Sequence, residues 1–200
     1  MPGASEPGAR RGPFPRRIPA SQIRRLRRHL AAGGVLAYAT ESCFGLGCDP
    51  RDRSAVARVL ALKGRSRAKG LILIAAEFSQ LRPYVATLAP AQKERLLAAW
   101  PGPCTFLVPA ARTAPPWILG KQRTVAVRVT AHPDAAALCR ALGMALVSTS
   151  ANRAGARPAR SYAECLRRFG HGAMVVPGRI GRRRRPSTII ALETGKIVRP

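Results

Sequence analysis

The chain has 200 residues, 46% of them hydrophobic, which is enough for one folded domain with a sizeable core. Its 35 lysines and arginines face only 9 acidic residues, so the formal net charge is +26 and we expect polyanionic partners, either nucleic acid or phosphate-bearing substrates. So few and scattered acids argue against paired catalytic carboxylates, and no apolar run approaches the ~20 residues of a membrane span.

Residues 1–17 are rich in proline, glycine and arginine and are predicted to be a disordered basic tail before a folded domain at 18–200. The same composition is typical of an organellar transit peptide, and the sequence leaves tail and targeting segment open. Without this segment and without Arg182–Arg185, 27 basic and 8 acidic residues remain, so the body itself is basic. An arginine-rich genomic composition accounts for part of this excess.

Helical and strand-like periods alternate in the first half of the domain. Apolar residues recur three or four positions apart in the helical segments, as at Ile23, Leu26 and Leu30. The predicted elements are a helix from 21 that ends at 33–34, a strand at 35–39, a polar turn at 40–47, a helix that is capped by Asp52 or Ser54 and ends at the cations from 63, and a strand at 71–75.

The second half continues the alternation at irregular spacing. Its predicted elements are a helix at 91–100, strands at 105–108 and 124–129 around a proline-rich loop, a helix opened by Pro133, a strand at 145–148, a helix with a Ser161/Glu164 capping box, and short strands at 175–176, 188–192 and 197–198. The irregular spacing and hairpin-like stretches predict a single α/β domain with a twisted, mixed parallel and antiparallel sheet flanked by helices.

Three polar clusters lie beside predicted strands, at 40–42, 63–69 and 148–152. The middle one holds Lys63, Arg65, Arg67 and Lys69, and cations this close repel one another unless an anion joins them. It therefore predicts a pocket for phosphate or carboxylate, although a helix C-terminus with a glycine cap would look similar. Likewise, 148–152 is also typical of a hydroxyl-capped turn. Ligands of open α/β sheets bind beyond strand ends, which favours a common site.

Other kinds of site find little support. His29, His132 and His171 show no metal-ligand spacing and are expected at the surface, so no metal-binding residue is predicted. No Walker-type glycine loop and no dinucleotide-binding glycine motif is present. The five cysteines form no C-x-x-C pair, which is typical of reduced thiols in a cytoplasmic protein.

Six segments together are similar to a known family. They are Tyr38–Pro50, Leu62–Arg65, Lys69–Ile74, Trp100–Phe106, Ala126–Val129 and Ser148–Asn152. In this order and at these spacings the chain resembles the threonylcarbamoyl-AMP synthases with a YrdC-type domain, in their short single-domain bacterial form, from about Ser21 to Pro200. It departs from the family pattern at Ala39, where the family has proline, and at Ser42, where threonine or a small residue is usual.

The resemblance implies a nucleotidyltransferase that condenses L-threonine, bicarbonate or CO2, and ATP into threonylcarbamoyl-adenylate and pyrophosphate. A separate tRNA-modifying complex then transfers the threonylcarbamoyl group to an adenosine of tRNA. It further implies a concave electropositive face, ATP as a substrate, Mg2+ carried by the nucleotide, a cytoplasmic location and no membrane. Non-specific RNA binding would follow from the charge.

Site residues are implied motif by motif. Lys63 and Arg65 match the family's K-x-R pair, and Ser150 and Asn152 its S-x-N pair, so these four are the expected catalytic residues. Expected ATP contacts are Arg65, Lys69, Thr105, Ser150 and Arg199, and expected threonine contacts are Thr40, Ser42, Ser148 and Ser187.

Two other functions stay open from the residues. A non-catalytic module that binds double-stranded RNA or assembles ribosomes would use the same charge, but it needs no K-x-R and S-x-N constellation. A lyase or synthase acting on sugar phosphates would need an acidic metal cluster, which this composition does not favour. Arg182–Arg185 either contact RNA or form a lid over the nucleotide.

Overall fold

The computed structural model describes residues 18–66, 70–119 and 123–200. The predicted tail at 1–17, together with Arg67 and Lys69, lies outside these ranges. The helices are α1 (Ala20–Ala31), α2 (Arg53–Lys63), α3 (Pro90–Ala99), α4 (Pro133–Leu142) and α5 (Tyr162–Phe169), with short 3-10 turns η1 (Phe78–Gln80), η2 (Arg82–Tyr84) and η3 (Pro116–Ile118). The strands are β1 (Leu36–Ala39), β2 (Phe44–Gly47), β3 (Ile72–Ala75), β4 (Cys104–Pro109), β5 (Thr124–Val129), β6 (Leu146–Ser150), β7 (Met174–Val175), β8 (Thr188–Ala191) and β9 (Ile197–Arg199).

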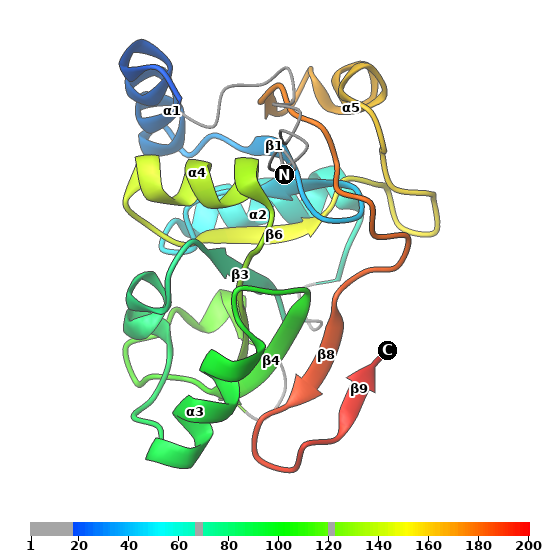
Figure 1. The fold of residues 1–200 in the computed structure, drawn as a ribbon. Helices are drawn as coiled ribbons and strands as arrows, with labels where there is room; N and C mark the ends of the chain where they lie inside the picture. The colour runs from blue at the N-terminus through cyan, green and yellow to red at the C-terminus, as the bar shows by residue number, and fades with distance from the viewer. Residues whose placement is uncertain (1–17, 67–69, 120–122) are drawn as a thin grey trace, which may run out of the picture.

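In the described chain these strands form one nine-stranded sheet in the order β7-β1-β2-β6-β3-β5-β4-β8-β9. The pairs β1–β7, β3–β5 and β4–β8 are parallel and the other five are antiparallel, which confirms the predicted mixed sheet. Figure 1 shows α1, α4 and α5 around the end with β1 and β6, and α3 beside β4 at the other end. None of the described helices is long and apolar enough to cross a membrane.

Helices cover both faces of the sheet around β1 and β3. Neighbouring residues of a strand point to opposite faces, and accordingly Leu73 and Ile74 belong to two separate buried clusters. The cluster with Ile74 includes Leu30 of α1 and Leu138 of α4, whereas the cluster with Leu73 includes α2 and α5. Both faces are therefore apolar in this part of the sheet, and polar side chains gather at strand ends.

The helix before the cationic stretch begins and ends as the sequence indicates. The Asp52 carboxylate accepts hydrogen bonds from the backbone N–H groups of Ser54 and Ala55, so Asp52 is the cap. Gly64 ends α2 in the left-handed conformation with φ 62°, which glycine adopts without strain. This turn carries the chain from Lys63, the last helical residue, toward β3.

The predicted polar turn at 40–47 is shorter than expected. Only residues 40–43 form the turn, and Phe44–Gly47 form β2, which pairs antiparallel with β1. Phe44 and Leu46 are fully buried, so apolar burial outweighs the low strand propensity of the two glycines. A side chain at Gly47 would collide with the carbonyl oxygen of Val147 and lie 2.8 Å from Tyr38 Oη.

The Gly47→Ala variant is therefore expected to be destabilised by about 2–4 kcal/mol, because the backbone of β6 cannot yield. Urea unfolding would measure this loss. Gly45→Ala is the matched control in the same strand, since its nearest neighbour would be Thr40 Cγ2 at 3.4 Å. Equal stability of the two variants would contradict the expectation that the close contact of Gly47 with the Val147 backbone excludes a side chain.

One histidine does not lie where the sequence placed it. His132 is buried, and its Nδ1 accepts a hydrogen bond from the Ala135 N–H at 3.4 Å, so it caps α4. The expected surface position is wrong for His132 because it packs at this helix start, while His171 is exposed as expected. No group of three or more histidine, cysteine or acidic residues in the described ranges could hold a metal ion.

Candidate active site

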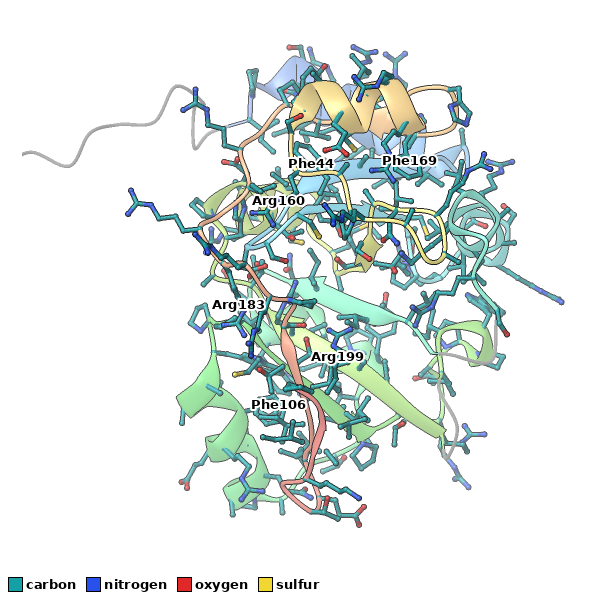
Figure 2. The ribbon with its side chains drawn as sticks, turned by 90° about the vertical axis from the view of Figure 1, so that its right-hand side faces the viewer. Phe44, Phe106, Arg160, Phe169, Arg183 and Arg199 are labelled. Carbon is teal, nitrogen blue, oxygen red and sulfur yellow. The ribbon has the colours of Figure 1, made fainter. Side chains whose placement is uncertain are left out.

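A pocket of about 650 Å³ lies where the turn after β1, the end of β6 and strands β4, β5, β8 and β9 meet. Five arginines line it, and no Asp or Glu is among its described lining residues: the arginines are Arg65, Arg128, Arg160, Arg184 and Arg199. Figure 2 shows Arg160, Arg183 and Arg199 along the region between Phe44 and Phe106. The volume suits a nucleotide with a second small ligand, and the charge suits anions.

The K-x-R and S-x-N motifs meet at one wall of this pocket. Lys63 Nζ donates to Asn152 Oδ1 at 2.7 Å and to the carbonyl oxygen and hydroxyl of Ser150 at 2.8 and 3.0 Å. The Ser150 hydroxyl donates to Asn152 Oδ1 at 2.6 Å. Asn152 Nδ2 donates to two backbone carbonyls, which fixes the orientation of its amide. Ser150 and Arg65 line the pocket, and Lys63 and Asn152 lie behind Ser150.

Burial, and then the neighbouring Arg65, lower the pKa of Lys63 from 10.5 to about 8. If the charged ammonium is needed, kcat/KM for ATP should fall as the pH rises through about 8, because kcat/KM reports the free enzyme. The check is a pH profile of pyrophosphate release at low ATP. The Lys63→Arg control keeps its charge and should not show this fall, and a wild-type profile that stays flat above that pKa would contradict the prediction.

A second group consists of Thr105 on β4, Ser187 immediately before β8, and Arg199 at the end of β9. Thr105 Oγ1 donates to Ser187 Oγ at 2.9 Å, and Arg199 Nη2 donates to the Ser187 carbonyl oxygen at 2.8 Å. Ser187 and Arg199 line the pocket, whereas Thr105 is fully buried and reaches it only through Ser187. Burial, and then Arg128 and Arg65, lower the pKa of Arg199, so three guanidinium groups lie close together.

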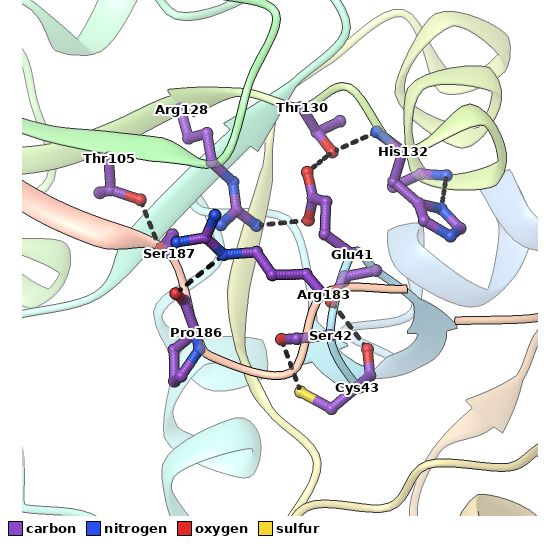
Figure 3. Close-up of polar contacts among 12 residues, drawn as sticks. Glu41, Ser42, Cys43, Thr105, Arg128, Thr130, His132, Arg183, Pro186 and Ser187 are labelled. Atoms are coloured by element: carbon purple, nitrogen blue, oxygen red, sulfur yellow. Dashed lines mark hydrogen bonds and ion pairs between the residues drawn. The ribbon is translucent and has the colours of Figure 1, made fainter. Parts of the chain in front are cut away.

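The hydroxyl cluster at the end of β1 forms a third group. Thr40 Oγ1 donates to the Cys43 carbonyl oxygen at 2.7 Å, and Thr40, Ser42 and Ser148 line the pocket. Arg128 of β5 lies beside this turn, with Nη2 3.3 Å from Glu41 Oε2 (Figure 3). Burial raises the pKa of the Cys43 thiol, which argues against a thiolate nucleophile here.

The segment with Arg182–Arg185 runs along this same turn. The N–H groups of Gly181 and Arg183 donate to the carbonyl oxygens of Thr40 and Glu41 at 3.0 and 3.1 Å. Arg182, Arg184 and Arg185 are all exposed, and of these three only Arg184 lines the pocket. This placement favours contact between Arg184 and a pocket ligand.

The structure thus gathers the implied site residues around one pocket, with Lys69 outside the described residues. Residue-by-residue reasoning missed Arg128 and Arg160, whereas Arg184 belongs to the run at 182–185 for which the sequence left RNA contact and a lid over the nucleotide open. A signal existed for Arg128: it interrupts the otherwise uncharged strand Thr124–Val129, and a charge in a buried strand needs a partner or a ligand.

Comparison with known proteins finds a family model and close relatives that match most of the chain. The family model Sua5/YciO/YrdC, described as telomere recombination, matches residues 28–200. A Thiobacillus denitrificans protein named threonylcarbamoyl-AMP synthase is 57% identical over 174 residues, which are 87% of this chain and 93% of that protein. A Chromobacterium violaceum protein of the same name is 54% identical over 189 residues, 94% and 97% of the two chains.

Solved structures also match most of this chain. P. abyssi Sua5 complexed with L-threonine superposes with a TM-score of 0.83 at 30% identity, and the match covers 92% of this chain but only 55% of that one. E. coli YciO superposes with a TM-score of 0.75 at 27% identity, covering 90% and 88% of the two chains. This chain therefore belongs to the Sua5/YciO/YrdC family.

Proposed function

We propose that the chain forms L-threonylcarbamoyl-AMP and pyrophosphate from L-threonine, bicarbonate or CO2, and ATP. One observation carries this proposal: an arginine-lined pocket has the Lys63–Ser150–Asn152 cluster at one wall and the hydroxyls of Thr40 and Ser148 at another. The high identity to proteins named threonylcarbamoyl-AMP synthase supports it.

The reaction needs positioning more than acid–base groups. The threonine amine and bicarbonate give a carbamate with loss of water. A carbamate oxygen then attacks the α-phosphorus of ATP, and the bond from that phosphorus to the leaving pyrophosphate breaks. No protein nucleophile is required, so fixed cations and hydroxyls can supply most of the catalysis by neutralising charge.

We assign the phosphate end to Lys63, Arg65, Ser150 and Asn152, with Arg199 as a further ATP contact. A single guanidinium can bind two oxygens of one phosphate, whereas lysine acts as a point charge. Thr105 supports the site through Ser187. Lys69 is an additional proposed ATP contact, although it falls outside the described residues.

We assign the amino-acid end to Thr40, Ser42, Ser148 and Ser187. Arg128, beside Thr40 and Ser42, is the proposed counter-ion of the threonine carboxylate, because a guanidinium binds a carboxylate with two parallel hydrogen bonds. Mg2+ would enter with ATP as part of the substrate, since the described pocket lining offers no carboxylate to hold it. We further propose that the reaction is cytoplasmic and that a tRNA-modifying transfer complex takes up the product.

Pyrophosphate release with purified protein tests this function. We expect release only when ATP, threonine and bicarbonate are all present, together with stabilisation against heat by ATP plus threonine. A module that only binds RNA would show neither, and the absence of threonine-dependent release would overturn the proposal.

The arginine segment gives a separate prediction. Arg184→Ala should raise the KM for ATP about fivefold, the worth of ~1 kcal/mol for one charge contact near water. Arg182→Ala should leave this KM unchanged, because Arg182 is exposed like Arg184 but does not line the pocket. RNA affinity should instead weaken similarly in both variants and fall steeply with salt. Equal ATP kinetics in the two variants would contradict a lid that closes with Arg184.

A further inference from the structure

Glu41 stands out because it is an acid held against the arginine-rich pocket without lining it. Its Oε2 lies 3.3 Å from Arg128 Nη2, and its Oε1 accepts a hydrogen bond of 2.6 Å from Thr130 Oγ1. Both partners are buried, with Arg128 7% and Thr130 2% exposed. Figure 3 shows the carboxylate between these two side chains.

The hydrogen bond from Thr130 has a fixed direction. Thr130 Oγ1 accepts from the backbone N–H of His132 at 3.1 Å, so the hydroxyl proton points to Glu41. The His132 ring is held by two further hydrogen bonds, to Ala135 and to Arg179. Because His132 Nδ1 accepts from the Ala135 N–H, its Nε2 carries the proton and donates to the carbonyl oxygen of Arg179 at 3.0 Å.

Glu41 is ionised in this setting. Burial raises the pKa of its carboxyl group, but the charge of Arg128 and the hydrogen bond from Thr130 outweigh burial, and the pKa lies below the usual 4.5. The main chain of the residue is held as well, since its carbonyl oxygen accepts from the Arg183 N–H at 3.1 Å. The carboxylate is therefore a fixed negative charge.

The ion pair leaves the arginine incompletely satisfied. Arg128 Nε is buried and has no hydrogen-bond partner among the described residues, although the guanidinium borders the pocket. A purely structural buried ion pair normally has its remaining donors satisfied, because breaking or leaving buried charges unpaired is costly. Because the arginine also borders the pocket, an anionic ligand there can pair with its charge.

Arg128 lies near other guanidinium groups that repel it, so its position requires a fixed partner of opposite charge. After burial, the charges of Arg128 and Arg65 both lower the pKa of Arg199, so these guanidinium groups repel one another. Without an opposite charge, Arg128 would gain by turning away from the other two. Glu41 pulls its guanidinium toward the turn that carries Thr40 and Ser42.

We propose that Glu41 is a positioning residue for the amino-acid substrate, which with Thr130 holds Arg128 in the orientation that binds the substrate carboxylate. This inference rests on the proposed function, in which Arg128 faces that carboxylate. Glu41 touches no substrate atom and acts through Arg128. The specific consequence is a cost in threonine binding that ATP binding does not share.

The test compares Glu41→Gln and Thr130→Val with wild type. Glu41→Gln keeps the size of the side chain and removes the charge, and we expect the KM for threonine to rise on the order of tenfold while the KM for ATP changes less than about twofold. Thr130→Val should act in the same direction with a smaller effect. The double variant should cost less than the sum of both, because the two substitutions disturb one arginine.

Glu77→Gln is the matched control, since Glu77 also pairs with an arginine, Arg140 at 3.7 Å, but is exposed and away from the pocket. Thermal unfolding of each variant and calorimetry of threonine binding accompany the kinetics. An unchanged threonine KM in both variants overturns the role of Glu41. Equal rises in both KM values with a lowered melting temperature indicate a structural role and overturn it too.

Calorimetry separates this inference from the proposed function. Wild-type protein that binds threonine without releasing pyrophosphate would contradict the proposed function, while the comparison of threonine affinity with Glu41→Gln would still decide the positioning role. If Glu41→Gln does not fold, Thr130→Val gives the decision, because it leaves the ion pair in place and removes only its support. Threonine affinity equal to wild type in that variant would then count against the proposal.

Discussion

Replacing Lys63 by alanine is expected to lower pyrophosphate release by a factor on the order of 10²–10³, the usual loss when one fixed group that stabilises a charged transition state is removed. The ammonium is buried and held by Ser150 and Asn152, so its position does not depend on the ligand. Its loss removes a positive charge at the wall assigned to the phosphates, and it takes one of the donors away from the Ser150 carbonyl oxygen and from Asn152 Oδ1. The carbamate would then approach phosphate charge that Lys63 no longer compensates.

Arg65→Ala should cause a loss of similar size, because Arg65 borders the pocket directly. Lys93→Ala on the outer face of α3 is the control that changes lysine to alanine elsewhere. Thermal unfolding should show that the variants are folded, and initial rates of pyrophosphate release at saturating substrates give the effect. Near-normal turnover in both Lys63→Ala and Arg65→Ala would remove the K-x-R pair from the mechanism.

Much of the fold could be predicted because local signals agreed with it. The Asp52 cap and the glycine at 64 mark the two ends of α2, and both act over a few residues. β2 was missed because Gly45 and Gly47 are typical of turns, whereas the strand exists for a non-local reason. Its glycine at 47 lets the backbone lie against β6, which is 100 residues further along the sequence.

In the site, too, some features could be predicted from the sequence and others depend on contacts between distant parts of the chain. The lysine of one motif and the serine and asparagine of another meet as the family resemblance implied, 87 and 89 residues apart. The resemblance gave Thr105 a direct role, but which polar residue faces the pocket and which lies behind it depends on the pleat of β4 and the position of β8. The pairing of Glu41 with Arg128 depends on the sheet order, which no short motif contains.

Valine is expected to be a poor substrate, with kcat/KM lower than that of threonine by a factor on the order of 10²–10⁴, and serine a weaker substrate than threonine. Valine has the shape of threonine with a methyl group in place of the hydroxyl, so packing alone would hardly reject it. The hydroxyl groups assigned to the amino-acid end, including that of Ser187, distinguish threonine from valine. Ser187 Oγ accepts from Thr105 and, at 3.3 Å, from Arg199, so its own proton is left to donate to a ligand.

Whereas Ser187 can donate a hydrogen bond to the substrate, Thr40 can accept one from it. Its proton is directed to the Cys43 carbonyl oxygen, so its oxygen can accept from the hydroxyl of the substrate. With valine bound, both groups would be buried without a partner, and each such group costs about 1–3 kcal/mol. Pyrophosphate release with threonine, serine and valine measures the preference. Ser187→Ala should reduce the ratio of kcat/KM for threonine to kcat/KM for valine, mainly by lowering the value for threonine. If valine supports release as well as threonine does in the wild type, these hydroxyls do not read the side chain of the substrate and the assignment of the amino-acid end is wrong.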